Sequence, residues 1–491
     1  MVHSNMKKLA VLAAAVGFMT ASQAFAADVT DVLDAADEVY LGNELVKDPF
    51  DIALTPTFKQ RYEWAKLKRE YNQSGYVRLL NELQYERVVN QMDIDLEVGM
   101  FHDLSLRVKM PIVFSDQSSY KFDTSSDKHA VTSSNSWFSN QIWAAGNTGT
   151  AADKANFPYK FFDLSDGNTL KGTDRSGIGD MSFGIAWSPF NSERHYIPER
   201  PWEREIGRST ITLGFDYIAP IGEVRSITND KIGNGVHELI FSVAASHRFS
   251  FVDPYIRLQY GYPVAAKDDD TYKEFNSNQT RVLPGMWGRI DLGAEFIPYE
   301  SIDPKFQRFV KIDLRGYFKY TAEGRAYSEL ADAFGKGNCY SISTDDLAAH
   351  PECNWVAEKW SNAGSENINA MADKSFKGQL TEDGIFDYEG FATVGGALNL
   401  NIQPIQYVAI IAGVAADYSQ NHFITYTKVG RDRGTYEDGK NEPNVKDGVV
   451  SLDSKDERSP VFSGALDAAG SRIKRTESIN LEWFVGLRLM Y

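Results

Sequence analysis

Residues 476–491 read TESINLEWFVGLRLMY, and this stretch at the end of the chain decides the fold. From position 479 onward every second residue is apolar, and most residues between them are polar, charged or glycine. The apolar series is Ile479, Leu481, Trp483, Val485, Leu487, Leu489 and Tyr491. Because successive side chains of a β-strand point to opposite faces, the pattern predicts a strand with one apolar and one polar face.

Eleven earlier segments show alternation of the same kind. They span residues 51–65, 87–99, 104–112, 178–189, 209–221, 236–249, 252–263, 286–298, 308–321, 387–402 and 406–418. With the last segment they give about twelve strands, an even number, as expected of single-chain bacterial outer-membrane barrels. We also expect the last strand to close the barrel by pairing with residues 51–65.

The connections between these segments give an independent indication. Links after the second, sixth and tenth segments are very short, whereas the long links follow odd-numbered segments. The long links are residues 66–86, 114–177, 264–285, 321–386 and 419–475. Short periplasmic turns that alternate with longer extracellular loops are typical of transmembrane barrels. We therefore predict an all-β, transmembrane antiparallel up-and-down β-barrel over residues 51–491, and not a secreted array of β-sandwiches.

Charged residues fall on the polar face of the predicted strands. A basic residue turned toward lipid costs roughly 2–4 kcal/mol near the midplane, whereas a cross-strand ion pair contributes only about 0.2–1 kcal/mol. The charges should therefore point inward. The candidate lumen-lining residues are Lys59, Arg61, Glu63, Asp93, Asp95, Glu97, Arg107, Lys109, Arg257, Arg289, Asp291, Glu295, Lys311, Asp313, Arg315 and Lys319. Their mixed signs fit either a narrow water-lined conduit or a lumen closed by ion pairs.

The N-terminal residues predict export. Lys7 and Lys8 precede an apolar stretch, residues 9–19, and then small residues that end in Ala24-Phe25-Ala26. This order is typical of a Sec signal peptide, here residues 1–26, cleaved after Ala26. The apolar stretch is too short to cross a ~30 Å hydrocarbon core. We expect residues 27–50 to form an acidic, partly helical periplasmic segment at the barrel mouth or inside it.

Composition and the remaining residue types exclude several other functions. The formal charge of −16, without a basic patch, argues against nucleic-acid binding. Cys339 and Cys353 fall in one long link and are expected to form a disulfide rather than a metal site. The histidines are scattered, and His237 and Ser242 fall on opposite faces of their strand. We therefore expect no cofactor, no metal site and no catalytic residue.

The C-terminal strand also indicates where in the cell the protein is located. A terminal aromatic residue that closes an alternating strand resembles the signal read by the outer-membrane assembly machinery, and here it would involve Trp483, Leu489 and Tyr491. We therefore expect the protein in the bacterial outer membrane. Its expected partners are the assembly machinery, outer-membrane lipid and lipopolysaccharide, and a small-molecule solute.

Several short sequence motifs resemble those of a known family. They are Leu96-Glu-Val-Gly99 running through His102-Asp103-Leu104-Ser105-Leu106 to Met110-Pro111, then Gly177-Ile178-Gly179-Asp180, and then Ala219-Pro-Ile-Gly-Glu223 with Gly233-Asn-Gly235 and the hairpin through Pro254-Tyr255. Over residues 87–262 the chain resembles the outer-membrane transporters named for the meta-pathway of phenol degradation. The resemblance implies a barrel that passes small, often aromatic or hydrophobic, compounds. The chain departs from the family in its links 114–177, 321–386 and 419–475, and no binding residue transfers.

Three functional hypotheses follow. The leading one is a passive channel or transporter for small molecules. The alternative is a non-conducting barrel that binds a partner or a cell surface through its long loops. The third is an outer-membrane lipid-modifying enzyme, which would need a Ser/His or His/carboxylate pair on the lipid side of the barrel.

Overall fold

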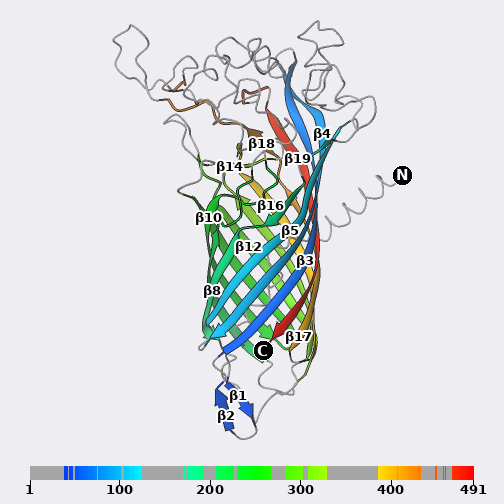
Figure 1. Ribbon diagram of the computed structural model, residues 1–491, viewed down its shortest axis with the longest axis vertical. Helices are drawn as coiled ribbons and strands as arrows, with labels where there is room; N and C mark the ends of the chain where they lie inside the picture. The colour runs from blue at the N-terminus through cyan, green and yellow to red at the C-terminus, as the bar shows by residue number, and fades with distance from the viewer. Residues whose placement is uncertain are drawn as a thin grey trace, which may run out of the picture.

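The computed structural model is a closed antiparallel β-barrel (Figure 1). The residues that it describes are 38–41, 44–47, 50–73, 76–100, 104–123, 170–172, 174–191, 206–225, 229–266, 272, 282–301, 308–328, 385–405, 407–432, 448–450, 457, 459, 467–470 and 472–490. Within these ranges, twelve long strands form the wall, which confirms the predicted fold class. Cys339, Cys353 and Tyr491 lie outside the described residues, so the disulfide and the end of the assembly signal stay predictions.

The wall is an up-and-down sheet in which each long strand pairs with the next. Its strands are β3 (Phe50–Gln73), β4 (Tyr76–Met100), β5 (Leu104–Phe122), β8 (Met181–Asn191), β9 (Ile206–Ala219), β10 (Val236–Phe249), β11 (Val252–Ala265), β12 (Trp287–Glu300), β13 (Phe309–Thr321), β16 (Phe391–Ile405), β17 (Val408–Ser419) and β19 (Ile473–Met490). Short strands add to the wall, namely β6 (Leu170–Lys171), β7 (Arg175–Ile178), β14 (Gly324–Tyr327), β15 (Ile385–Tyr388) and β18 (His422–Thr425).

A separate hairpin precedes the barrel. β1 (Glu38–Leu41) pairs with β2 (Glu44–Lys47) below the barrel in Figure 1. The prediction of a partly helical segment is therefore wrong for these residues. The pair places Val39 opposite Val46 and Tyr40 opposite Leu45, and such β-branched and aromatic residues favour strands.

The barrel closes where the sequence predicted. β19 pairs with β3 along most of its length, with Val485 opposite Phe58 and Glu482 opposite Arg61. Because the number of long strands is even, the start of β3 and the end of β19 lie at the same end of the barrel. The turn between β10 and β11 at this end consists only of Ser250 and Phe251. The links at this end include the short ones that the sequence indicated.

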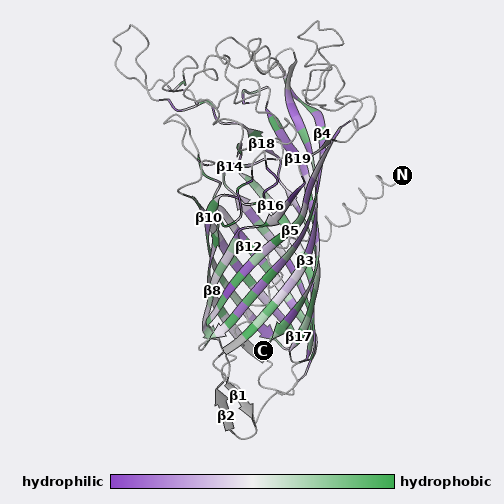
Figure 2. Cartoon of the chain, in the orientation of Figure 1, coloured by the Kyte–Doolittle hydropathy of each residue, from purple (hydrophilic) through white to green (hydrophobic). Residues whose placement is uncertain are grey.

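The outward face of the wall is apolar and exposed. Along the strands, apolar and polar residues alternate (Figure 2), and many of the outward apolar side chains are more than a third exposed, as Leu292 at 59% and Val414 at 52% illustrate. Aromatic side chains border this surface at both ends. Toward the long links they are Tyr260, Tyr262, Tyr320 and Tyr418, and toward the short turns Phe190, Phe249, Phe251, Tyr299 and Tyr407.

The height of this apolar surface can be estimated from one strand. Between Tyr407 and Tyr418 the chain has about eleven residues at ~3.3 Å each, and a tilt of ~40° converts that length into a height of roughly 25–30 Å. An apolar band ~25 Å tall between two aromatic girdles is the outer surface of a barrel that sits in a lipid bilayer.

Inside the wall, glycines make room for large aromatic side chains. Tyr255 lies directly opposite Gly293, and Gly261 directly opposite Trp287. A Cβ atom added at Gly293 would lie 2.2 Å from the Tyr255 hydroxyl. Gly413 stands in the same relation to Phe484, which is 2% exposed. Covering a strand glycine with an aromatic ring fixes register as well as filling space.

One predicted loop is a sheet. Residues 66–86 continue the β3–β4 hairpin far beyond the apolar band, which corrects the prediction of a long extracellular link there. We call this part, residues 66–86, the extension. Next to the lipid its alternation is inverted: Leu67 and Leu83 point inward and are fully buried, whereas Glu86 points outward with a side chain that is 43% exposed. Here the outer face meets water, so the apolar residues lie inside. Farther along the hairpin, Arg69 and Glu82 form a buried ion pair at 2.7 Å, and Tyr76 and Val77 are exposed.

Candidate functional site

The predicted lumen residues lie on the side of the wall opposite the exposed apolar face. This holds for Arg61, Glu63, Asp93, Asp95, Glu97, Arg107, Lys109, Arg289, Asp291, Asp313 and Arg315, each of which alternates with outward neighbours along its strand. Most are buried, and Asp291 and Arg315 are 0% and 1% exposed. Such charges are tolerated only when they are paired and hydrogen-bonded.

The wall formed by β3, β4 and β5 is crossed by ion pairs. Asp93 accepts from two ammonium groups, Lys59 at 2.7 Å and Lys109 at 2.9 Å. Arg107 binds Asp95 at 2.6 Å, with its Nε and Nη2 both engaged. Asp95 stands opposite Lys109 in the register, so Arg107 reaches it diagonally. The acidic and basic residues of this hairpin thus neutralise one another across strands.

The opposite wall mixes charges with aromatic and amide groups. The hydroxyl of Tyr255 donates to Asp313 at 2.7 Å, and the Asn399 amide donates to the other carboxylate oxygen at 2.9 Å. Arg289 binds Asp291 at 2.6 Å and lies over the Tyr317 ring, 4.0 Å from its centroid. These contacts hold the side chains in fixed positions against the wall.

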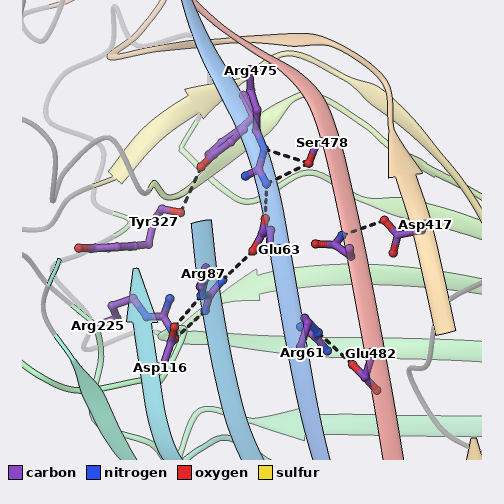
Figure 3. A network of polar contacts seen from close by, with 12 residues as sticks. Arg61, Glu63, Arg87, Asp116, Arg225, Tyr327, Asp417, Arg475, Ser478 and Glu482 are labelled. Atoms are coloured by element: carbon purple, nitrogen blue, oxygen red, sulfur yellow. Dashed lines mark hydrogen bonds and ion pairs between the residues drawn. The ribbon is translucent and has the colours of Figure 1, made fainter. Parts of the chain in front are cut away.

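A second network lies higher in the lumen, toward the extension (Figure 3). Asp116 accepts two hydrogen bonds of 2.6 Å from Arg87 and one of 3.0 Å from Arg225. Glu63 accepts from Arg475 and, at 3.5 Å, from Arg87. Four strands, β3, β4, β5 and β19, and the segment after β9 meet at this point.

Tyr327 of β14 contacts two arginines of this network, Arg175 and Arg225. Arg175 donates to the Tyr327 hydroxyl at 2.7 Å, and the guanidinium groups of Arg175 and Arg225 lie 5.0 and 5.4 Å from the ring centroid. We call Arg87, Arg175, Arg225 and Arg475 the arginine cluster. Burial first, and then the neighbouring charge of Arg87, lower the pKa of Arg225 below its ordinary value.

None of the four arginines of this cluster is among the residues predicted from the sequence. Arg87 was placed on a strand but was not among the candidates, Arg475 lay just before the predicted last strand, and Asp116, Arg175 and Arg225 fell in predicted links. A possible signal was the continued alternation of residues 116–120, where Asp116, Ser118 and Tyr120 are all buried on one face.

The lumen contains space that solvent reaches. The Arg61 side chain is 46% exposed although its Nε binds the buried Glu482 at 3.0 Å. Arg61 points away from the exposed apolar face, so this exposure is to the interior of the barrel. Deeper charges such as Asp93 and Asp313 are far less exposed. The interior is therefore wider at the level of Arg61 and tightly packed toward the short turns.

One serine–histidine pair lies on the outward face. Ser209 of β9 and His247 of β10 stand opposite each other, and their Oγ and Nδ1 atoms are 2.7 Å apart. The pair is exposed at the end with the short turns, beside Phe249. Among the described residues, no carboxylate or amide side chain contacts His247. The pair thus has a nucleophile and a base but no third group to orient the imidazole.

The described residues hold no group of three or more His, Cys, Asp or Glu side chains arranged for a metal ion. In the same part of the chain, no helix is long and apolar enough to cross a membrane.

Comparisons with known proteins give distant likenesses. No family model and no curated protein matches the sequence. Among solved structures, an outer-membrane channel from Pseudomonas putida F1 has a TM-score of 0.38 and 10% identity, and the match covers 92% of this chain and 100% of that one. A FadL homologue from Pseudomonas aeruginosa has a TM-score of 0.28 and 8% identity over 97% and 99% of the two chains.

The outer-membrane protease OmpT from Escherichia coli gives a TM-score of 0.27 and 8% identity over 90% and 97% of the two chains. At these TM-scores the likeness carries no inference about function or substrate. The resemblance to the meta-pathway transporters therefore rests on the sequence motifs alone.

Proposed function

We propose that this chain is an outer-membrane channel of a bacterium that passes small molecules passively through its lumen. The observation that carries the proposal is the solvent-exposed Arg61 side chain inside a closed barrel whose outer face is apolar. The lumen of such a barrel links the two sides of the membrane, and water-filled space in it provides a path for solutes. Export by a signal peptide cleaved after Ala26 is part of the proposal.

The size of the barrel supports a narrow path. Eight strands leave an interior filled by side chains, and sixteen or more leave an open aqueous channel. Twelve strands lie between these cases. The ion pairs of Asp93 and the hydrogen bonds of Asp313 lie in the narrow part, and the space beside Arg61 forms a wider vestibule above it. Aromatic or hydrophobic solutes are implied only by the family resemblance.

Conductance across a planar lipid bilayer tests the proposal. We expect purified, folded full-length protein to insert and to give discrete, reproducible current steps under an applied voltage. The same preparation unfolded by heat is the control and should give none. A bilayer that stays sealed after verified insertion of folded barrel would contradict the channel and favour the alternative, a barrel that acts through its surface loops.

The Ser209–His247 pair supports a second candidate function, the hydrolysis of lipid esters at the membrane interface. A hydroxyl hydrogen-bonded to an imidazole can act as a nucleophile with its general base. We would measure fatty-acid release from phospholipid in detergent micelles by the wild type, Ser209→Ala and, as control, Ser242→Ala, whose serine lies on the other face. Activity that is lost only in Ser209→Ala would support hydrolysis, and absence of activity in the wild type would exclude it.

A further inference from the structure

Within the ion pairs of the lumen, the cation is the partner that solvent reaches. The Arg61 side chain is 46% exposed and its partner Glu482 is 4% exposed. Arg87 is 24% exposed against 6% for Asp116. The corresponding values are 20% and 9% for Arg107–Asp95, 17% and 3% for Lys109–Asp93, and 18% and 6% for Arg225–Asp116.

The remaining pairs define how far this asymmetry extends. The deep pairs Arg289–Asp291 and Lys311–Glu295 keep the same order at low exposure, and Arg475–Glu63 is even. The reverse order occurs in Arg248–Glu300 and Arg325–Asp387, which lie toward the ends of the wall, and in Lys68–Glu477 on the outer face. Outside the lumen the order is mixed, since Arg472–Glu70 and Lys428–Glu323 again have the more exposed cation. Between the two ends of the wall, the described lumen pairs are even or have the cation as the more exposed partner.

The cause is side-chain length. A carboxylate on a short stem stays near the backbone of the wall, whereas the long stems of arginine and lysine pass over it and carry the charge toward the barrel axis. A solute in the lumen therefore meets N–H groups first. Three carboxylates, those of Glu97, Asp216 and Glu238, are half-buried on the same inner surface and oppose the positive field of the cations.

The arginine cluster adds a concentrated positive charge above Arg61. Three of its guanidinium groups, those of Arg87, Arg225 and Arg475, pair with Glu63 and Asp116, and Arg175 donates to the Tyr327 hydroxyl and the Asn229 carbonyl. The Nε atom of Arg225 is buried and has no hydrogen-bond partner among the described residues. Buried donors are normally satisfied, so this N–H favours an acceptor that enters the cluster.

The surroundings of the cluster strengthen its electrostatic interaction with a solute. The inward side chains Leu67, Leu83 and Tyr85 of the extension and Tyr120 of β5 are at most 3% exposed, and Arg475 lies over the Tyr85 ring at 5.5 Å. An apolar surrounding lowers the local dielectric constant and lengthens the reach of each charge. A guanidinium group also binds carboxylate and phosphate oxygens in a bidentate manner.

We propose that the lumen selects small organic oxyanions, with carboxylates as the simplest case, and that the arginine cluster and Arg61 bind the oxyanion on its way through. This inference rests on the proposed channel function. It runs against the overall charge of the chain, which is −16. The class of solute that binds is set by the accessible hydrogen-bond donors of the lumen and not by the net charge of the chain.

The test is the reversal potential of the full-length protein in a planar bilayer under a potassium chloride gradient, followed by potassium acetate. We expect the sign of an anion-selective path, with chloride current reduced when acetate is added. In Arg61→Gln/Arg225→Gln the anion-to-cation permeability ratio should fall at least ~2-fold toward one, because charges within about a Debye length of the path are removed.

Lys66→Gln/Lys68→Gln is the matched control. It also removes two positive charges, from the outer face of the extension, where Lys66 and Lys68 pair with Glu477, and it should leave the ratio unchanged. A wild-type channel that conducts without preference, or prefers cations, would overturn the inference and leave the channel function standing. A channel that never conducts would overturn the proposed function instead. The wild-type measurement decides both even if Arg61→Gln/Arg225→Gln does not fold.

Discussion

At the scale of single residues, the interior is fitted by pairs of a glycine and an aromatic ring. Gly293→Val should destabilise the barrel, because the new side chain would occupy the position of the Tyr255 ring, whose hydroxyl binds Asp313. Overpacking of this kind costs about 1–3 kcal/mol. Gly288→Val is the control, since its Cβ would meet only the Gln259 carbonyl oxygen at 4.0 Å. Equal midpoints of thermal unfolding in micelles would contradict the expectation.

His422 should make the wall above the lipid sensitive to acid. Its ring is 2% exposed, stacks on Phe391 at 4.1 Å and has a buried Nε2 without a hydrogen-bond partner. Burial lowers its pKa to about 4. Because the folded pKa lies below the unfolded value, its stabilisation is present above pH ~6.5 and is lost as the pH falls toward 4. Between pH 7 and 5 the loss is about 2 kcal/mol.

The neighbouring Asp387 acts in the opposite direction. Burial raises its pKa to about 6, so its stabilising contribution is present at low pH and is lost as the pH rises through 6. The difference between the wild type and His422→Gln isolates the histidine. We expect hydrogen exchange of the β18 amides to show a larger loss of protection from pH 7 to pH 5 in the wild type. Parallel profiles for the two proteins would refute this role of His422.

At the scale of elements, the extension should unfold separately from the part of the wall in lipid. Leu83 is fully buried on its inner face, and Leu→Ala changes at such sites cost about 2–5 kcal/mol. We expect Leu83→Ala to raise hydrogen exchange in residues 76–86 of β4, with little change in residues 92–99. Glu86→Ala, on the opposite face in a solvent-exposed pair with Lys121, should have a small effect. Exchange that rises equally along the whole of β4 would show that the strand opens as one unit.

The extension also shows what the sequence could and could not predict. Alternation with apolar residues facing outward identified the strands in lipid, and the pairing of the last strand with residues 51–65 followed from their shared polarity. The hairpin of residues 66–86 was not predicted, because water replaces lipid outside it. Its apolar residues Leu67 and Leu83 therefore face inward. The arginine cluster and its partner Asp116 were not predicted for a related reason. Asp116 and Arg225 come from segments beyond the lipid, where polarity no longer identifies the inner face.

At the scale of the whole molecule, two electrostatic terms of opposite sign act on a solute. The net charge of −16 is spread over the chain, whereas the accessible cations beside Arg61 and Arg225 lie within the path. The dependence on ionic strength distinguishes the two electrostatic terms, since the Debye length is ~10 Å at 0.1 M and ~3 Å at 1 M. A solute inside the lumen lies within a few ångströms of the cations, so their effect survives better at high salt.

We therefore expect the anion-to-cation permeability ratio to decrease from 0.1 M to 1 M potassium chloride and still to exceed one. The salt series of reversal potentials on the wild type gives this curve. Arg61→Gln/Arg225→Gln should give a flatter curve near one, because less fixed charge is left to screen. A ratio that rises with salt would mean that the acidic exterior dominates at low ionic strength, and the selectivity could then not be assigned to the lumen cations.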